Sequence, residues 1–343
     1  MEKIVEWFPS MGPIVNSLPF AFVMLIVGFV LLIKGADFFV DGSSDVAKKL
    51  RVPAIIIGLT VVAMGTSLPE AAVSISAGLK GSNELAISNV LGSNLFNLLV
   101  VVGLCAIMAP VIVKKEIVKR DIPISIGAAI VLMILGLIGM SLGRVDAVVL
   151  LVLFVAFIVF LVLEALKARK QAGGADEEEE EKARPIWLCL VFIVGGAIAI
   201  MLGGDAVVDS AITIAYAAGM SENLVGLTIV AVGTSLPELV TSVVAARKKE
   251  VELSLGNAIG SNIFNILMIL GLAGVISPLA VTAENIIDLI VLMGVSALIW
   301  LVCFINKKLG RVMGICMVSF YIVYVVYLIF RAPVHTFVMN LIA

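Results

Sequence analysis

Ten stretches of this 343-residue chain are mainly apolar over about 20 residues or more, the length that a helix needs to cross a bilayer. They fall at roughly residues 18–46, 53–80, 84–109, 121–142, 145–168, 185–218, 222–247, 251–277, 283–305 and 310–331. Hydrophobic residues make up 62% of the chain and charged residues 14%, a balance that excludes a soluble enzyme. Helices satisfy their own backbone hydrogen bonds in lipid. The sequence therefore predicts an all-α integral membrane protein with ten transmembrane helices.

The chain repeats itself, with its polar motifs in register. GTSLPE occurs at 65–70 and 233–238, and GSN(L/I)FN at 92–97 and 260–265, so that both motifs recur 168 residues later. Each copy contains five of the ten predicted helices. Because five is odd, the second copy enters the bilayer from the opposite side, which predicts two inverted five-helix repeats. The predicted organisation is a first repeat at 1–170, an acidic linker at 171–184 and a second repeat at 185–343.

Loop charges predict the orientation. With the N-terminus outside, eighteen Lys and Arg residues fall in the inner loops and four (Lys3, Lys80, Arg144 and Arg331) outside. Positive charge marks the cytoplasmic face, so both termini are expected outside a plasma membrane that the chain crosses many times. The six acids at 176–181 favour a solvated cytoplasmic hinge, with regulatory calcium binding as the lesser alternative.

The candidate ligands are oxygen atoms. The four cysteines lie in apolar runs without CxxC spacing, and the single histidine, His335, lies beyond the last apolar run. No cofactor, nucleic acid or obligate protein partner is indicated; the lipid bilayer is the expected environment. Oxygen donors bind hard cations such as Ca²⁺, Na⁺ and Mg²⁺.

Each GTSLPE motif is expected to break its helix near the membrane centre. These are the second and seventh helices, where proline lacks an amide hydrogen and glycine loosens the backbone. Carbonyl groups that lose their helix partners at that depth need a cation or a hydrated cavity. Around the breaks, oxygen-bearing side chains share helix faces at spacings of three, four or seven residues. They are Ser67, Glu70 and Ser74; Ser235, Glu238 and Ser242; Ser93 and Asn97; and Ser261 and Asn265.

Helix packing is the alternative explanation for the small residues of these motifs. For Gly58, Gly65, Gly92 and Gly260 it is at least as good as a functional one. It does not explain the carboxylates of Glu70 and Glu238, because charged groups within a membrane are costly and are functional by default. Lys34 is the only basic residue well inside an apolar segment. It has no counterpart in the second repeat, so it cannot neutralise both acids.

These motifs resemble those of the sodium/calcium exchangers of the cation/calcium antiporter superfamily, in their prokaryotic form. The resemblance covers essentially the whole chain and implies ten helices in two inverted repeats. It also implies a calcium site made by the carboxylates of Glu70 and Glu238 and the backbone carbonyls of Thr66 and Thr234. The sodium sites that it implies share both glutamates and use the carbonyls of Ala63 and Ala231 and the side chains of Ser67, Ser235, Ser93, Ser261, Asn97 and Asn265. Neutral Asn265 resembles the potassium-independent pattern, whereas Ser88, aligned with Gly256, is a departure of unknown meaning.

The expected function is electrogenic antiport of Na⁺ against Ca²⁺ by alternating access, in which the two ions compete for shared ligands. A proton/calcium exchanger of the same fold and a cation channel are the alternatives. Asp37 and Asp41, with their counterparts Asp205 and Asp209, are interpreted as solvated interfacial acids or, less favourably, as acidic attractors on the access pathways.

Overall fold

The computed structural model describes residues 17–80, 83–109, 111–171, 184–220 and 231–342. Within these ranges almost all regular structure is helical, which confirms the all-α prediction. The helices of the first half are α3 (Leu18–Leu50), α4 (Ala54–Ile57), α5 (Ala63–Thr66), α6 (Leu68–Lys80), α7 (Asn83–Phe96), α8 (Val102–Met108), α9 (Ile122–Leu137) and α10 (Arg144–Gln171). Those of the second half are α12 (Ile186–Ala217), α14 (Ala231–Gly233), α15 (Leu236–Arg247), α16 (Val251–Phe264), α17 (Leu270–Ile276), α18 (Ala283–Asn306) and α19 (Arg311–Ile342).

Four π-helical segments extend some of these helices: η2 (Gly58–Val62), η3 (Asn97–Val101), η4 (Ile117–Asp121) and η6 (Asn265–Ile269). Counting them, eight described helices are long and apolar enough to cross a membrane, and the bent pair Ala54–Thr66 and Leu68–Leu79 makes a ninth span. The expected seventh span, 222–247, lies partly outside the described residues and stays a prediction. So does the acidic linker, most of which is likewise not described.

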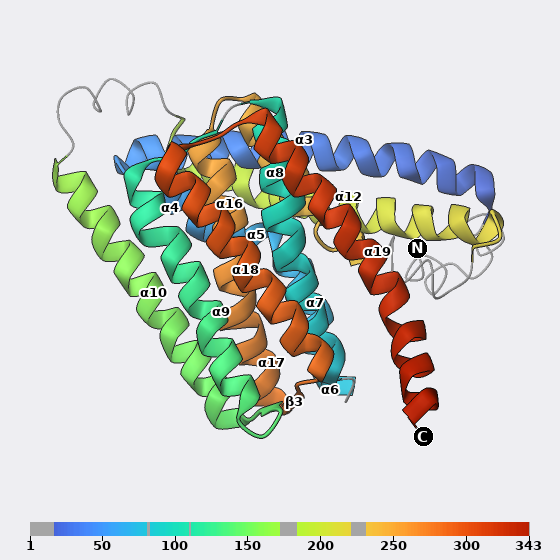
Figure 1. Cartoon of the computed structure of the whole chain (residues 1–343). Coiled ribbons are helices and arrows are strands. Elements are labelled where there is room, and N and C mark those ends of the chain that lie inside the picture. Colours follow the sequence, from blue (N-terminus) through green and yellow to red (C-terminus); the bar gives the residue numbers. More distant parts are fainter. Residues whose placement is uncertain (1–16, 81–82, 110, 172–183, 221–230, 343) are drawn as a thin grey trace.

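Helices α3 and α12 form an antiparallel pair that crosses the other helices at a steep angle (Figure 1). Their closest approach is made by glycines: a Cβ on Gly28 would lie 2.9 Å from the Gly203 carbonyl oxygen, and one on Gly35 would lie 2.9 Å from that of Gly196. Any larger residue would push the backbones apart. At about 1.5 Å per residue, the 33 residues of α3 span about 50 Å, well over the roughly 30 Å of a bilayer core. The pair therefore fits a membrane only at a tilt.

Glycines also set the contact between the two halves inside the bundle. A Cβ on Gly58 would lie 2.9 Å from the Gly256 Cα, and one on Gly260 would lie 2.7 Å from the Leu59 Cα. The packing interpretation is thus confirmed for Gly58 and Gly260, and Gly65 packs in the same way against the Phe39 ring. It is wrong for Gly92 as far as the described residues go, because an added Cβ would meet none of their atoms within 4 Å. Ser88, which in the first repeat occupies the position of Gly256, is exposed and accepts a hydrogen bond from Asn285 Nδ2 at 3.0 Å.

Two short antiparallel ladders join loops from opposite halves of the chain. Strand β1 (Val111–Ile112) pairs with β4 (Lys308–Leu309), and β2 (Ser141–Leu142) pairs with β3 (Leu279–Ala280). The first ladder brings the basic loops around Lys114 and Lys308 together. Three ion pairs extend this basic end of the molecule: Lys114–Glu252 (2.5 Å), Lys248–Asp41 (2.7 Å) and Arg184–Asp45 (2.7 Å).

The acids of α3 at this basic end are paired. Lys248 Nζ lies 2.7 Å from Asp41 Oδ1 and 3.3 Å from Asp37 Oδ1, and it donates to the Asp37 carbonyl oxygen at 2.9 Å. Both acids are also about one third exposed, as expected for solvated interfacial acids, and the turn after α15 adds a cation partner that sequence spacing does not reveal. Asp205 and Asp209 also have interaction partners.

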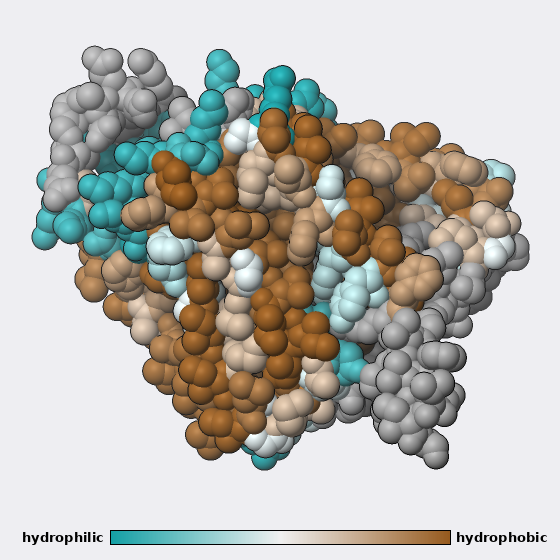
Figure 2. Space-filling view, in the orientation of Figure 1, coloured by the Kyte–Doolittle hydropathy of each residue, from teal (hydrophilic) through white to brown (hydrophobic). Residues whose placement is uncertain are grey.

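The outer surface is divided by polarity. Figure 2 shows apolar residues covering most of the face of the bundle in view, while hydrophilic residues gather mainly at the basic end. Large hydrophobic side chains of α10 and α18, among them Val152, Val155, Leu298 and Leu301, are exposed. Soluble monomers rarely expose apolar patches beyond a few hundred Å². An apolar belt capped by charge is the surface of a protein with several membrane-spanning helices.

Candidate cation site

The site begins at the two GTSLPE breaks. α5 ends at Thr66 and α6 starts at Leu68, and the two helical segments meet at an angle of 51°. Ser67 (φ −84°, ψ 10°) and Ser235 (φ −92°, ψ 6°) have nearly the same non-helical backbone conformation. Pro69 and Pro237 follow two residues later, and neither can donate the amide hydrogen that would continue the preceding helix. The predicted breaks are confirmed in both halves, and each places a glutamate in the first turn of a new helix.

Glu70 and Glu238 are completely buried and are held by serines from both halves of the chain. Glu70 Oε1 accepts hydrogen bonds from Ser93 (3.2 Å) and from Ser235 (3.0 Å). Glu238 Oε1 accepts equivalent bonds from Ser261 (3.5 Å) and Ser67 (2.7 Å). Each motif thus donates its serine to the glutamate of the other, so the two carboxylates share a single site.

Four buried oxygen atoms of the predicted site residues have no hydrogen-bond donor among the described residues. They are Glu70 Oε2, Glu238 Oε2, Asn97 Oδ1 and Asn265 Oδ1. A buried acceptor left without a partner costs on the order of 1–3 kcal/mol, and more when it is charged. Two carboxylate and two amide oxygens with their lone pairs free are the donor set that a hard cation takes. Both glutamates also lie in the first turn of a helix, where the amide groups favour negative charge.

Asparagines hold the two central helices, α7 and α16, together. Asn94 Nδ2 donates to the Asn262 carbonyl oxygen, and Asn262 Nδ2 donates to that of Asn94, both at 3.2 Å. Asn97 Nδ2 donates to Asn262 Oδ1 at 3.2 Å, and Asn265 Nδ2 to Asn94 Oδ1 at 3.0 Å. These bonds use the amide nitrogens of Asn97 and Asn265, and among the described residues no donor bonds to their buried oxygens.

The structure brings most of the predicted side chains together. The two glutamates and the four serines form two hydrogen-bonded groups, Ser93–Glu70–Ser235 and Ser261–Glu238–Ser67. Asn265 joins the first group through a 3.2 Å bond to Ser93. Thr66 and Thr234 adjoin the breaks, and the binding of a cation by their carbonyl groups stays a prediction. The Ala63 carbonyl already accepts the Ser67 amide at 3.1 Å and the Thr66 hydroxyl at 3.4 Å. Ala231 opens α14, and its side chain lies outside what the structure describes.

No basic side chain of the described residues contacts either glutamate. Lys34 lies 3.8 Å from Asp37 and its side chain is 69% exposed, so it does not neutralise the site, as the sequence predicts. The described residues also form no cluster of three or more acidic, histidine or cysteine side chains. Within this part of the chain the site has two carboxylates and only neutral polar groups beside them.

Sequence reasoning missed two features of the site. The first is a set of four asparagines outside the predicted site that bond to its elements: Asn89, Asn94, Asn257 and Asn262. The 168-residue register contains the signal, since it pairs Asn89 with Asn257 and Asn94 with Asn262. Both Asn97 and Asn265 also open π-helical segments, a geometry that often occurs at functional sites. No pattern of residues in the sequence predicts these π-helical segments.

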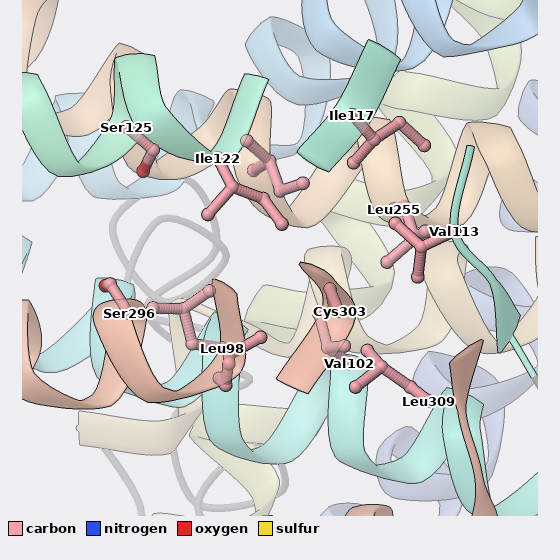
Figure 3. Close-up of a pocket in the computed structure, with 12 residues that line it drawn as sticks. Leu98, Val102, Val113, Ile117, Ile122, Ser125, Leu255, Ser296, Cys303 and Leu309 are labelled. Atoms are coloured by element: carbon pink, nitrogen blue, oxygen red, sulfur yellow. The ribbon is translucent and has the colours of Figure 1, made fainter. Parts of the chain in front are cut away.

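A separate pocket differs chemically from the cation site. It lies between η4, α9, α16 and α18, and its lining is apolar except for Ser125, Ser296 and Cys303 (Figure 3). It contains no carboxylate or amide oxygen of the kind that binds a cation.

Comparison with known proteins matches these features to one family. The profile described as sodium/calcium exchanger protein matches residues 20–163 and 188–330. Sodium/calcium exchanger MaX1 of Methanosarcina acetivorans is 35% identical, covering 90% of this chain and 98% of its own length. Inner membrane protein YrbG of Escherichia coli is 36% identical over 91% of this chain and 97% of its own.

Solved structures agree with the sequence comparisons. The sodium-calcium exchanger NCX_Mj, from a crystal soaked with Na⁺ and Sr²⁺, superposes with a TM-score of 0.79 at 33% identity. The superposition covers 90% of this chain and 99% of that one. The likeness therefore extends over nearly the whole of both molecules.

Proposed function

The chain belongs to the sodium/calcium exchanger protein family of membrane antiporters, and we propose that it exchanges Na⁺ for Ca²⁺ across the membrane by alternating access. One observation carries the proposal: among the described residues, two buried carboxylate oxygens and two buried amide oxygens of the GTSLPE and GSN(L/I)FN motifs have no hydrogen-bond donor. Because the site uses no covalent chemistry, transport follows from binding and from a change in which side is open.

The two cations would compete for the same ligands. Ca²⁺ would bind between Glu70 and Glu238, with the backbone carbonyls of Thr66 and Thr234 completing the site, since two carboxylates match its charge. Na⁺ ions would use the same glutamates together with neutral oxygens. Those are the carbonyls of Ala63 and Ala231 and the side chains of Ser67, Ser235, Ser93, Ser261, Asn97 and Asn265. Occupation of both carboxylates by one cation excludes the other, so that a sodium gradient drives calcium the opposite way.

The proposed architecture is ten helices in two inverted repeats, 1–170 and 185–343, joined by the linker 171–184. Several contacts support it, because they recur with partners exchanged: Gly28–Gly203 with Gly35–Gly196, the reciprocal Asn94–Asn262 bonds, and ladder β1–β4 with ladder β2–β3. The antiparallel α3–α12 pair is the expected sliding unit, and helices α7 and α16 belong to the fixed core. The site would then lie near the membrane centre.

We expect transport assays in vesicles to identify the driving ion. Purified protein reconstituted into liposomes should take up Ca²⁺ when Na⁺ is loaded inside and diluted outside, because each ion displaces the other from the shared carboxylates. Uptake would be followed with a calcium indicator dye, and vesicles without protein provide the control. Uptake driven by a pH gradient alone would indicate proton exchange, and uptake without any gradient of Na⁺ or H⁺ would indicate a channel.

Orientation in the plasma membrane, with both termini outside, gives a second expected result. In a background that lacks the exposed Cys316, a cysteine at Lys115 should be shielded from an impermeant thiol reagent in intact cells, and one at Gly219 should be labelled. The reason is that Lys115 lies in a basic loop, which favours the cytoplasm. The reverse labelling pattern would invert the orientation, and permeabilised cells, in which both sites react, provide the control.

A further inference from the structure

Two asparagines 168 residues apart support the backbone beside the glutamates. Asn257 Nδ2 donates to the Glu238 carbonyl oxygen at 3.3 Å and to Ser242 Oγ at 2.9 Å. Asn89 Nδ2 makes the corresponding bonds to the Glu70 carbonyl oxygen (3.5 Å) and Ser74 Oγ (3.0 Å). Neither asparagine is among the residues assigned above to bind the ions.

The two asparagines have the same register but different surroundings. Asn257 Oδ1 also accepts a hydrogen bond from the Thr66 hydroxyl at 2.9 Å, and both of these side chains are buried. That bond joins the break of the first half to the glutamate of the second. In the described part of the chain no equivalent bond joins Thr234 to Asn89, and both of those residues are half-buried. Among the described residues the threonine–asparagine bond is thus present in one half of the site only, whereas the serine–glutamate bonds occur in both.

We propose that Asn257 is a positioning residue for calcium, which aligns the Thr66 segment with Glu238 through its three hydrogen bonds. This inference rests on the proposed function, in which the Thr66 backbone carbonyl binds Ca²⁺ and is not a ligand of Na⁺. Asn257 therefore sets the affinity for calcium more than that for sodium. In the proposed orientation the basic residues 247–249, directly before α16, face the cytoplasm, which places Asn257 on the cytoplasmic side of the site and Asn89 on the outer side.

The test compares Asn257→Ala with Asn89→Ala and Thr66→Val in reconstituted vesicles. Loss of a group that orients a metal ligand commonly weakens metal affinity by about 10–100-fold. We expect Asn257→Ala to raise the Ca²⁺ concentration for half-maximal uptake about tenfold, with half-saturation by Na⁺ and the maximal rate changed less than twofold. Asn89→Ala should raise the Ca²⁺ concentration for half-maximal uptake about threefold or less. A general structural defect would instead lower the maximal rate and weaken both ions together.

A double-mutant cycle tests the bond itself. If Thr66 acts through Asn257, the variant carrying both Thr66→Val and Asn257→Ala should be no weaker than Asn257→Ala alone. Ser254→Ala provides the matched control. Ser254 is buried like Asn257 and lies one turn earlier on α16, but its side chain bonds Cys105. The Ca²⁺ concentration for half-maximal uptake should therefore stay at the wild-type value. Should Asn257→Ala fail to fold, Thr66→Val removes the same bond with little change in volume and should raise half-saturation by Ca²⁺ alone.

Three results would overturn the proposal: unchanged calcium half-saturation in Asn257→Ala, fully additive effects in the double variant, or equal effects of Asn257→Ala and Asn89→Ala. Wild-type protein is measured in the same experiment. Absence of sodium-driven calcium uptake by the wild type would count against the proposed function itself, whereas normal wild-type uptake with unchanged variants counts against the positioning role alone.

Discussion

Glu70→Gln and Glu238→Gln are each expected to abolish calcium transport while the protein still folds. An amide keeps the volume of the side chain but removes one of only two carboxylates that the described site contains. Half of the charge that would balance Ca²⁺ is then lost inside a low-dielectric environment, where an unbalanced charge is most costly. Transport would be measured as sodium-driven calcium uptake into proteoliposomes, and folding as elution volume and melting temperature in detergent.

The chain provides a matched control for these variants. Glu252 is also a glutamate near the start of a helix, but it pairs with Lys114 at the basic end of the molecule. Glu252→Gln should therefore transport calcium at close to the wild-type rate. Near-normal uptake by either Glu70→Gln or Glu238→Gln would remove the central claim that the paired carboxylates bind the transported ion.

Exchange is expected to be electrogenic and to require no potassium. With two carboxylates and the neutral Asn97 and Asn265, bound Ca²⁺ leaves the site near neutrality, whereas three or more Na⁺ leave a net positive charge. Moving one charge through 100 mV is worth about 2.3 kcal/mol, roughly a fiftyfold change in the calcium gradient that exchange can sustain. An imposed potassium–valinomycin potential should shift calcium uptake accordingly, and uptake without valinomycin provides the control.

Asn265→Asp tests the same charge count from within the site. The new carboxylate would stand where a buried amide oxygen now has no donor. We expect it to change the dependence on monovalent cations without destroying calcium binding. Exchange that is insensitive to membrane potential, or that needs potassium on the calcium-bearing side, would show that another ion shares the site. The count of charges given above would then be wrong.

Much of this protein can be predicted from the sequence, because lipid restricts what an apolar segment can do. Its apolar segments must form helices, and Pro69 and Pro237 cannot donate the amide hydrogen that would continue the helix before them. The 168-residue register likewise identifies Glu70 and Glu238 as a pair, since two intramembrane acids in matching positions need a common reason. These conclusions depend on covalent structure, on solvent and on local chain order, all of which the sequence contains.

Tertiary structure alone decided which atoms of those residues remain available. The sequence does not reveal that Ser67 bonds Glu238 rather than Glu70, or that Asn97 and Asn265 use their nitrogens on the opposite helix and leave their oxygens free. Nor does it show that Asn257 reaches Thr66 while its counterpart Asn89 makes no such bond to Thr234, or that Lys248 pairs with Asp37 and Asp41. These contacts join residues more than 100 positions apart, and they exist only because glycine-lined helices approach closely enough to bring them together. A repeated sequence therefore predicts equivalent residues in each half, but the packing of one half against the other determines what each of them does.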